Sequence, residues 1–406
     1  MASAPAGGAR GPITIGVLYS TNSAAQSALG VSTATSFDST SVAKALVAYY
    51  NAHGGLQGHQ LSAVYHGFGA DDPSFDNDLQ QACADFTQDH HVSIVVDLAG
   101  AWSATFQQCL AGAHVPYFGA EISDDQDMAS FPGLVNPSDR SMDDRERAVI
   151  DVLGQTGYLS THDKIGVVYE QCPNTTRARS FGLEAAARRR KLTVASAYGI
   201  GCITGFASSG GDASQLQEAV LQFQTAGVDR VMFVSNYESA LLLLFARAAD
   251  NANWHPGYAL SSNAGAGTLA SSIPQGQVVN FHGAGWIPNG DVNSSAPIGA
   301  NGQRCLAILG AAGIRPASSA DAFTAYSGCE EIFLLDKTLG VANALDYASI
   351  LRSVGSLATT YGSTIALAGA TSFGSTRHAA AADVSPFAYS PSCSCIAYSG
   401  PPAPYL

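Results

Sequence analysis

The sequence predicts an α/β fold of two lobes, each built on a doubly wound parallel sheet. Short apolar runs rich in Val and Ile alternate with stretches of helical spacing along most of the chain, as in parallel sheets whose two faces are covered by helices. At 406 residues the chain is longer than most domains with a single hydrophobic core, so we expect two lobes, each with its own core.

The first lobe opens with an apolar strand and alternates from there. In chain order we expect strand 13–18, helix 40–53, strand 60–66, a helix that follows the turn 72–74, strand 92–97, helix 104–113 and strand 115–118. In the helix after the turn, Phe75, Leu79, Cys83 and Phe86 are spaced so that they share one face. That face is predicted to pack on the sheet.

A segment rich in Pro and Gly, 130–144, interrupts the alternation and is interpreted as a crossing between the lobes. The pattern restarts behind it as helix 144–155, strand 164–170, helix 176–191, strand 192–198, helix 214–226, strand 229–235, helix 237–251 and strand 257–262. These elements predict a second parallel sheet.

The last third of the chain is expected to contribute elements to both lobes. A stretch rich in Gly, Pro and Asn, 283–302, precedes helices with few strands of their own, at 303–313, 320–339 and 344–354. We expect these helices to complete the first lobe and the tail 384–400 to return to the second. The predicted N-terminal lobe is therefore 1–136 with 284–384, and the predicted C-terminal lobe is 137–283 with 385–406.

Composition and charge exclude several classes of partner. The net charge of −13 argues against nucleic acid and against an anionic membrane surface, since both are bound through surplus Lys and Arg. No apolar run approaches the roughly 18 residues that a membrane span needs. The start, MASAPAGGARGP, is interpreted as lying just after a removed leader or lipid-anchor segment, which predicts a periplasmic protein or a cell-surface lipoprotein.

The eight cysteines, an even number, suit an oxidising compartment. Of the roughly 105 possible pairings, we predict the one that follows the order along the chain: Cys83 with Cys109, Cys172 with Cys202, Cys305 with Cys329, and Cys393 with Cys395. The alternative for the last pair is a metal site. It is less favoured because structural zinc sites usually space their cysteines by two residues and add a second ligand pair.

Enzyme signatures are absent from the sequence. It contains no G-x-x-x-x-G-K-[ST], no G-x-S-x-G and no H-E-x-x-H. The stretch 265–270 resembles a dinucleotide fingerprint but lacks the acid about 20 residues further on, so we interpret it as a turn into a helix. The adjacent acids Glu330-Glu331 and Asp124-Asp125 are interpreted as solvated surface groups, because neighbours in sequence point to different sides of an element.

Polar and aromatic residues follow several of the expected strands. In open parallel sheets the carboxyl ends of the strands form the edge at which ligands bind. In the first lobe this edge would carry Tyr19, Ser20, residues 100–103 and residues 119–121; in the second it would carry Glu170, Gln171, Asn174, Asn236, Tyr237, Ser262 and Asn263. Two such edges would face each other across a cleft.

The stretch ALVAYYNAHGGLQGHQLSAVYHGFGADDP, 45–73, resembles a segment of the type I periplasmic binding proteins of the leucine/isoleucine/valine-binding kind. Those proteins have a helix, N-A-x-G-G-I-x-G-x-x-L, a strand, and then Asp and Pro. In this chain Gly54 and Gly55 would end the helix at positive φ, and Gly58 would shape the turn into a strand beside the first. Similar segments continue at 93–120, 164–170, 226–250 and 322–340.

The resemblance implies a three-strand hinge between the lobes and a ligand site in the cleft. Carried over by position, the ligand contacts would be Tyr19, Trp102, Ser103, Ala120, Glu121, Glu170, Asn174, Tyr237, Ser262 and Asn263. In amino-acid-binding members the strand before Ser262 is followed by an acid that holds the ligand amine, whereas this chain has Ser261-Ser262-Asn263. Glu121 or Glu170 could replace that acid, and an aromatic or less charged solute would suit the site equally well.

The resemblance therefore implies a monomeric, non-catalytic protein without cofactor or metal, which captures a small polar solute and delivers it to the permease of an ABC importer. One alternative is an extracellular ligand-sensing domain of a signalling system with the same fold. Another is a two-lobed α/β enzyme that uses Glu121 or Glu170.

Overall fold

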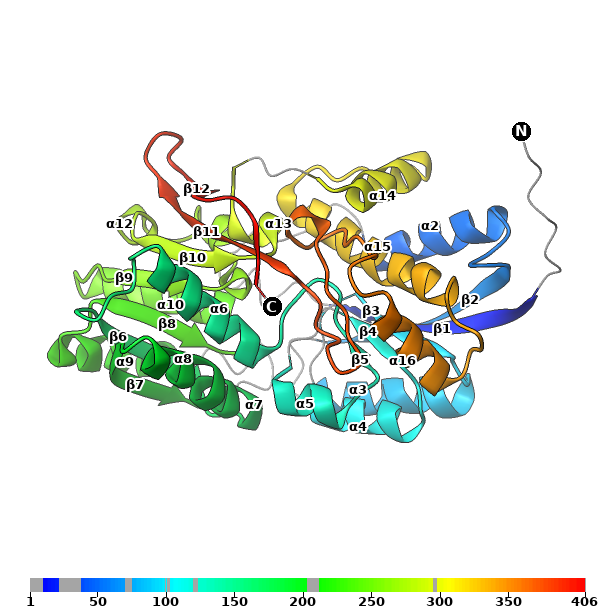
Figure 1. Cartoon of the computed structure of the whole chain (residues 1–406), viewed down its shortest axis with the longest axis horizontal. Helices are drawn as coiled ribbons and strands as arrows, with labels where there is room; N and C mark the ends of the chain where they lie inside the picture. The colour runs from blue at the N-terminus through cyan, green and yellow to red at the C-terminus, as the bar shows by residue number, and fades with distance from the viewer. Residues whose placement is uncertain are drawn as a thin grey trace.

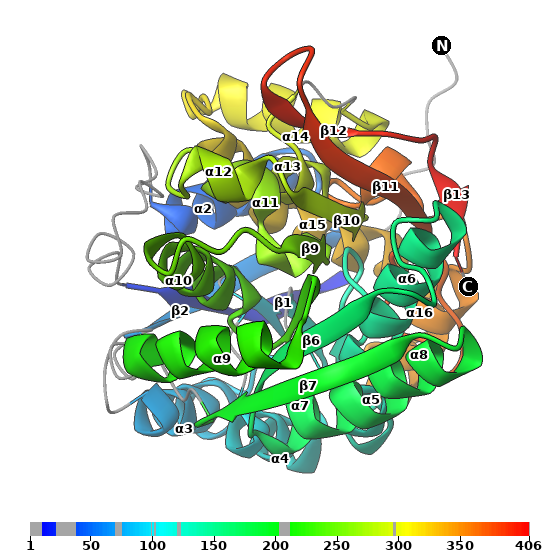
Figure 2. The same cartoon turned by 90° about the vertical axis from the view of Figure 1, so that its left-hand side faces the viewer.

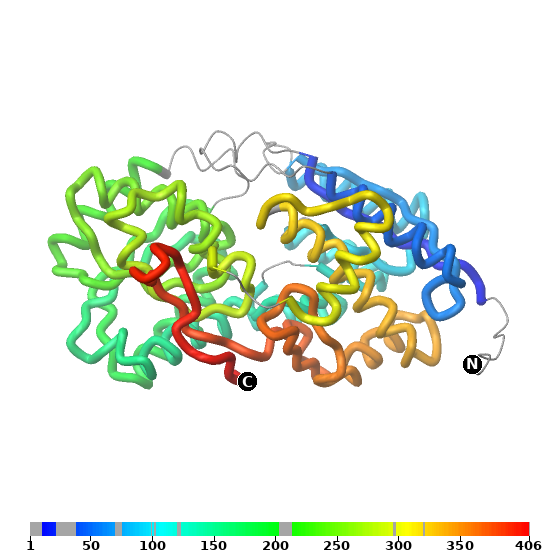
Figure 3. The backbone as a smooth tube through the Cα atoms, turned by 90° about the horizontal axis from the view of Figure 1, so that it is seen from above, coloured from blue at the N-terminus to red at the C-terminus, as the bar shows by residue number. Residues whose placement is uncertain are grey.

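The computed structural model describes residues 10–21, 38–69, 75–98, 100, 103–119, 123–202, 212–294 and 298–405. Two lobes lie side by side, each a sheet with helices on both faces (Figures 1 and 3). None of the helices within the described ranges is long and apolar enough to cross a membrane. This is the α/β, two-lobed fold that the sequence predicts.

The first lobe is built on a five-stranded parallel sheet in the order β2-β1-β3-β4-β5. Its strands are β1 (Arg10–Ser20), β2 (His59–Phe68), β3 (Ile94–Asp97), β4 (Tyr117–Gly119) and β5 (Leu134–Val135). Helices of the chain's first third are α2 (Ser39–Ala52), α3 (Phe75–Ala84), the π-helix η1 (Asp85–Asp89), α4 (Ala104–Gly112) and α5 (Asp125–Ser130). The expected face of Phe75, Leu79, Cys83 and Phe86 is buried against the sheet.

The turn between α2 and β2 has the backbone that its glycines predict. Gly54, Gly55 and Gly58 all have φ between 84° and 95°, a region that favours glycine. A Cβ atom on Gly55 would lie 2.1 Å from the carbonyl oxygen of His59. The close approach lets the chain reverse at once and lay β2 beside β1.

The two faces of the first sheet are covered by helices from different parts of the chain. One face packs on α3, η1 and α4, around Leu18, Val95 and Tyr117. The other packs on α2 and on α14 (Ala300–Ala311), α15 (Ser319–Leu339) and α16 (Tyr347–Ser356). The last third of the chain therefore supplies most of one face of the first lobe (Figure 1).

The second lobe is built on an eight-stranded sheet, β12-β11-β10-β9-β8-β6-β7 with β13 paired to β11. The strands are β6 (Lys164–Glu170), β7 (Thr193–Ile200), β8 (Arg230–Val234), β9 (Gly257–Leu260), β10 (Phe281–Gly285), β11 (Asp383–Ser390), β12 (Cys395–Tyr398) and β13 (Ala403–Pro404). Strands β6 to β10 are parallel, and β11 runs antiparallel to β10. The tail thus returns to the second sheet, as expected, although as antiparallel edge strands.

Helices cover both faces of the second sheet as well (Figure 2). On one face lie α6 (Met142–Gln155), α7 (Pro173–Arg177), the π-helix η2 (Ala178–Glu184) and α8 (Ala185–Arg189). The other carries α9 (Asp212–Ala226), α10 (Glu238–Asn251), η4 (Ser262–Ala264), α11 (Ala266–Leu269) and α12 (Gln275–Val278), with α13 (Pro288–Asp291) beside η4. The 3-10 helix η5 (Leu367–Gly369) lies between α16 and β11. The residue limits of the two lobes stay a prediction.

The interpretation of the two acidic pairs as solvated surface groups is wrong for three of the four acids. Glu330 and Glu331 lie in α15 with exposed fractions of 0% and 1%. Asp124 is also buried, because it caps the N-terminus of α5 by accepting from the backbone N–H of Asp127 and is paired with Arg177 of α7. Asp125 remains accessible to solvent.

All four predicted cysteine pairs are disulfides in the structure. Cys83–Cys109 joins α3 to α4, whereas Cys393–Cys395 closes the turn between β11 and β12. The structure therefore does not support a metal site at Cys393 and Cys395.

We expect removal of Cys83–Cys109, by replacing both residues with alanine, to lower the free energy of unfolding by about 3 kcal/mol, because the bond constrains a loop of 26 residues in the unfolded chain. Removal of Cys393–Cys395, which constrains a separation of only 2 residues, serves as the matched control and should change stability far less. Urea denaturation of the two double variants measures both. Equal losses in the two variants would contradict the loop-entropy explanation.

Candidate functional site

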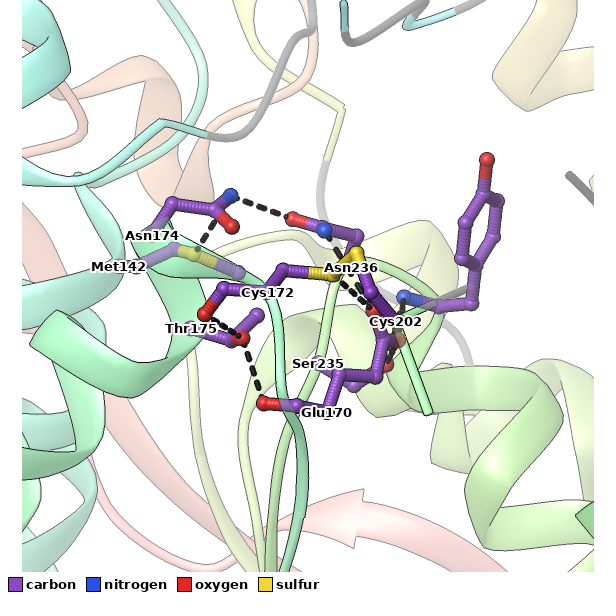
Figure 4. The surroundings of a disulfide bond; sticks show 9 residues. Met142, Glu170, Cys172, Asn174, Thr175, Cys202, Ser235 and Asn236 are labelled. Carbon is purple, nitrogen blue, oxygen red and sulfur yellow. Dashed lines mark hydrogen bonds between the residues drawn. A yellow bond between two sulfur atoms is a disulfide. The ribbon is translucent and has the colours of Figure 1, made fainter. Parts of the chain in front are cut away.

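The second lobe gathers polar groups around Glu170, the last residue of β6. Its carboxylate accepts hydrogen bonds from the hydroxyl of Ser235, from Nδ2 of Asn236 at 3.5 Å and from the backbone N–H of Tyr237 at 3.4 Å (Figure 4). These groups meet because β6 and β8 are neighbours in the sheet and their carboxyl ends lie at one edge. Glu170 is fully buried, and the three donors offset the cost of burying its carboxylate.

Asn174, in the first turn of α7, extends this cluster. Its Nδ2 donates to Oδ1 of Asn236 at 2.8 Å and lies 3.6 Å from the sulfur of Met142. Figure 4 shows these side chains beside the Cys172–Cys202 disulfide. The carboxyl end of β6 is thus surrounded by amide and carboxylate groups.

The same place brings three possible metal ligands together. Atoms of Glu170, Cys172 and Cys202 lie within 4.8 Å of one another. The two sulfurs are bonded to each other, however, and a disulfide has no thiolate to offer a metal. This cluster is therefore a polar site closed by a disulfide.

Tyr237 follows Asn236 and directly precedes α10 of the second lobe. It is half-buried at the N-terminus of α10. Burial is the largest cause that raises the pKa of Tyr237 to about 12, and the negative charges of Glu170 and Asp76 add to it. Asp76 belongs to α3 of the first lobe, so the phenol lies within reach of charges from both lobes.

The facing edge of the first lobe is also polar and buried. The hydroxyl of Ser103, which precedes α4, donates to Oδ1 of Asp76 at 3.0 Å. Asp97 ends β3 and accepts a 2.5 Å hydrogen bond from the hydroxyl of Tyr117 in β4. Ser103 and Asp97 are exposed by only 2% and 1%. Both lobes therefore present acids at the carboxyl ends of their strands.

Several solved structures share this arrangement of two sheets. A possible leucine/isoleucine/valine-binding protein from Rhodopirellula baltica superposes with a TM-score of 0.68 at 18% identity, over 97% of each chain. A periplasmic binding protein of type 1 from Bordetella pertussis gives a TM-score of 0.67 at 13% identity, over 97% of this chain and all of that one. The chain has the type I periplasmic binding protein fold.

A third structure with this type I fold is the solute-binding protein of an ABC transporter from R. palustris, in complex with 4-hydroxybenzoate. It superposes with a TM-score of 0.65 at 12% identity, over 96% of each chain. No protein-family model and no curated protein matches the sequence. The similarity to these solved structures is therefore a similarity of fold. It is the fold that the family resemblance in the sequence implies.

In this type I fold, Ser262 and Asn263 are engaged by the crossing between the lobes. The hydroxyl of Ser262 accepts from the backbone N–H of Trp286 at 2.7 Å, and Nδ2 of Asn263 donates to Oδ2 of Asp139 at 3.2 Å. The indole N–H of Trp286 donates to the other oxygen of Asp139 at 2.7 Å. These two predicted ligand contacts therefore help to hold the hinge.

The other predicted contacts differ in where they lie. Glu170, Asn174 and Tyr237 belong to one hydrogen-bonded cluster, whereas Ser103 is hydrogen-bonded to Asp76 of the first lobe. The ring of Tyr19 lies against Gly67 of β2, where a Cβ would be 2.8 Å from Cζ of Tyr19. Trp102, Ala120 and Glu121 lie outside the described residues.

The sequence analysis missed Asp76, Asp139 and Ser235. Ser235 could have been found, because it is the residue that directly follows the apolar strand 230–234. Asp76 lies in the first turn of a helix, where an acid is expected for reasons of helix stability alone. Asp139 gave no local signal, since its partners Asn263 and Trp286 are far away in sequence.

A surface depression of about 680 Å³ lies elsewhere. It is lined by His91, Val92, Ser93, Ala113, His114, Val115, Leu345, Asp346, Tyr347 and Ala348. Residues 91–93 and 113–115 precede β3 and β4, at the amino ends of the strands, and residues 345–348 lie at the start of α16. The depression is open to solvent. We therefore place the candidate site at the carboxyl ends, where the polar clusters are.

Proposed function

We propose that the protein binds a small solute between its two lobes and delivers it to the permease of an ABC importer outside the cytoplasm. The observation that carries this proposal is the polar cluster at the carboxyl ends of β6 and β8, where the buried carboxylate of Glu170 accepts from Ser235, Asn236 and the backbone N–H of Tyr237. In open parallel sheets such edges bind ligands, and hinged lobes can close around them.

The names of the similar solved structures support this proposal. One is a possible leucine/isoleucine/valine-binding protein, and another holds 4-hydroxybenzoate and is described as part of an ABC transporter. A small amino acid or an aromatic solute is therefore the class that we test first. The proposal includes neither catalysis nor a cofactor, and we propose that the protein acts as a monomer.

The experiment is a thermal-shift screen with a panel of amino acids, aromatic acids and amines, followed by small-angle scattering with any solute that stabilises. A bound solute should raise the melting temperature, since ligand binds only the native state, and should reduce the radius of gyration as the lobes close. Neither stabilisation nor compaction with any small molecule would contradict the proposal.

Tyr237→Ala is expected to weaken solute binding by about 1–3 kcal/mol, because the half-buried ring supplies apolar and stacking area beside the polar cluster at the carboxyl ends of β6 and β8. Titration calorimetry with a solute from the screen measures the loss. Tyr389→Ala is the matched control: Tyr389 is also half-buried and packs on the same hydrophobic cluster, but it lies near the amino end of β10. Equal losses of affinity in both variants would show that Tyr237 acts only through the fold.

A further inference from the structure

The short helix α5 is anchored in the first lobe and ion-paired to the second. It lies between β4 and β5 of the first sheet, and Met128 and Phe131, in and just after the helix, pack on the core of that lobe. At its other end, Nη2 of Arg177 in α7 lies 2.8 Å from Oδ1 of Asp127, and Nε of the same arginine pairs with Asp124, the N-cap of α5. Figures 1 and 2 show α5 beside α7.

A second arginine of the second lobe holds the same helix. Nη2 of Arg147, in α6, lies 3.0 Å from Oδ2 of Asp125, whose other oxygen accepts from the hydroxyl of Ser141. The backbone N–H of Asp125 donates to Oδ2 of Asp143 at 2.9 Å. Among the ion pairs of the described residues, three join helices of different lobes, and all three involve α5 or its N-cap.

Both guanidinium groups are stabilised where they lie. Burial lowers the pKa of Arg177, but the hydrogen bond and charge of Asp124 and the charge of Asp127 outweigh it, so the pKa is raised overall. The pKa of Arg147 is also raised, since Asp125 and acids of α6 outweigh burial. A single exposed ion pair contributes little, but these partly buried pairs share one short helix and form a network.

Hinge bending has to change these contacts. Asp124 and Asp127 move with β4 and β5 of the first sheet, whereas Arg177 moves with β6 of the second, whose carboxyl end leads into α7. The chain passes from one sheet to the other between β5 and β6. A rotation of one lobe against the other therefore alters the separation of the paired charges.

We propose that α5 is a latch between the lobes: Arg147 and Arg177 hold it against the second lobe, and the lobes separate fully only when these ion pairs break. This goes beyond the proposed function, because it concerns the equilibrium between closed and open arrangements whether or not a solute is bound. A change at α5, outside the cluster around Glu170, should then shift how far the lobes separate.

The test compares the native chain with Arg147→Met/Arg177→Met, in dialysed protein at pH 7.5 without any solute. Burial and the charge of Asp124 raise the pKa of Asp127 to about 6, so this acid is ionised under the conditions of the test. Small-angle scattering gives the radius of gyration of each protein. We expect a larger radius in the double variant, with an unchanged content of secondary structure by circular dichroism.

A distance between the lobes is measured in the same proteins. All eight cysteines are in disulfides, so cysteines introduced at the exposed positions Ala48 in α2 and Gln224 in α9 take spin labels specifically. Pulsed electron spin resonance then gives the distribution of distances between a label in each lobe. We expect the double variant to shift this distribution to longer distances and to broaden it.

Arg189→Met/Arg190→Met is the matched control. It also removes two arginines, but their partner Asp151 lies in α6, so these ion pairs stay within the second lobe. The control should keep the native distances. Arg147→Lys/Arg177→Lys, which keeps both charges, should lie closer to the native chain than the methionine variant does.

A distance distribution of the Arg147/Arg177 methionine variant that matches the native one would overturn the latch, and so would an equal shift in the control. If the double variant does not fold, Arg177→Met alone, which removes the contact with two acids, is judged by the same criteria. Because the test contains no solute, failure of the latch leaves the proposed function standing, and a solute screen without a hit leaves the latch standing.

Discussion

Asp139→Ala is expected to lower the free energy of unfolding by about 3–5 kcal/mol. Asp139 is 3% exposed and accepts from the indole of Trp286, from Asn263 and from the backbone N–H of Arg140. Its Oδ2 also lies 3.9 Å from the buried guanidinium of Arg145. Alanine would leave several buried donors without a partner, each costing about 1–3 kcal/mol, and would remove an acid from beside a buried cation.

Urea denaturation measures this loss. Asp250→Ala is the matched control, because Asp250 is an acid in a surface pair with His255 and should change stability by less than about 1 kcal/mol. Since Asp139 joins the crossing to loops of the second lobe, scattering should also show an altered distance between the lobes. A loss below about 1 kcal/mol for the Asp139 variant would mean that the crossing does not depend on it.

Asp291 should make the protein less stable as the pH rises. This acid is fully buried, and burial raises its pKa from the usual value of 3.8 to about 7, despite the hydrogen bonds that it accepts from Tyr398 at 2.6 Å and from the backbone N–H of Ile287 at 2.9 Å. Between these two values the native state holds a proton that the unfolded state has lost. The stabilisation is therefore complete below pH 3.8 and lost as the pH rises through 7, by about 4 kcal/mol in total.

Asp291→Asn isolates this contribution. Asparagine keeps an acceptor for Tyr398 and Ile287 but carries no charge, so it resembles the protonated acid. The variant should match the native chain in stability near pH 4 and exceed it by about 4 kcal/mol at pH 8. Denaturant titrations between pH 4 and pH 8 give the free energy of unfolding of both proteins. A difference in this free energy that does not change with pH would contradict the predicted contribution of Asp291. Other groups, such as His282, titrate in both proteins, so their contributions to the free energy of unfolding cancel in the difference.

The order of strands and helices could be predicted from the sequence because each signal is local. The strand 164–170 and the helical face that begins at Phe75 are patterns of neighbouring residues, and the glycines at 54 and 55 mark a turn whose geometry few other residues adopt. Pairing the cysteines in chain order succeeded because each pair joins elements close in sequence. The antiparallel return of β11 is less local, since it pairs with a strand about 100 residues earlier in the chain.

The site was harder to predict because its contacts are long-range. Ser262 and Asn263 are bonded to Trp286 and Asp139, and no nearby residue in the sequence predicts those partners. That Ser262 and Asn263 contact a ligand stays a prediction. Glu330 and Glu331 were misjudged for another reason. The part of α15 around Glu330 and Glu331 has apolar residues on all sides, which is typical of a buried helix. Burial of the helix outweighs the usual preference of acids for solvent.

The division of the first core between distant parts of the chain has a consequence for synthesis. The face that holds Ile15 and Val96 is finished only when α14, α15 and Phe373 arrive, whereas the opposite face is complete once Leu134 has been made. At a synthesis rate of about 5–20 residues per second, an apolar sheet face stays open for tens of seconds while the second lobe is being made. Throughout that interval the nascent chain offers this face to chaperones and to other unfolded chains, and no fragment that ends before the last third can bury it.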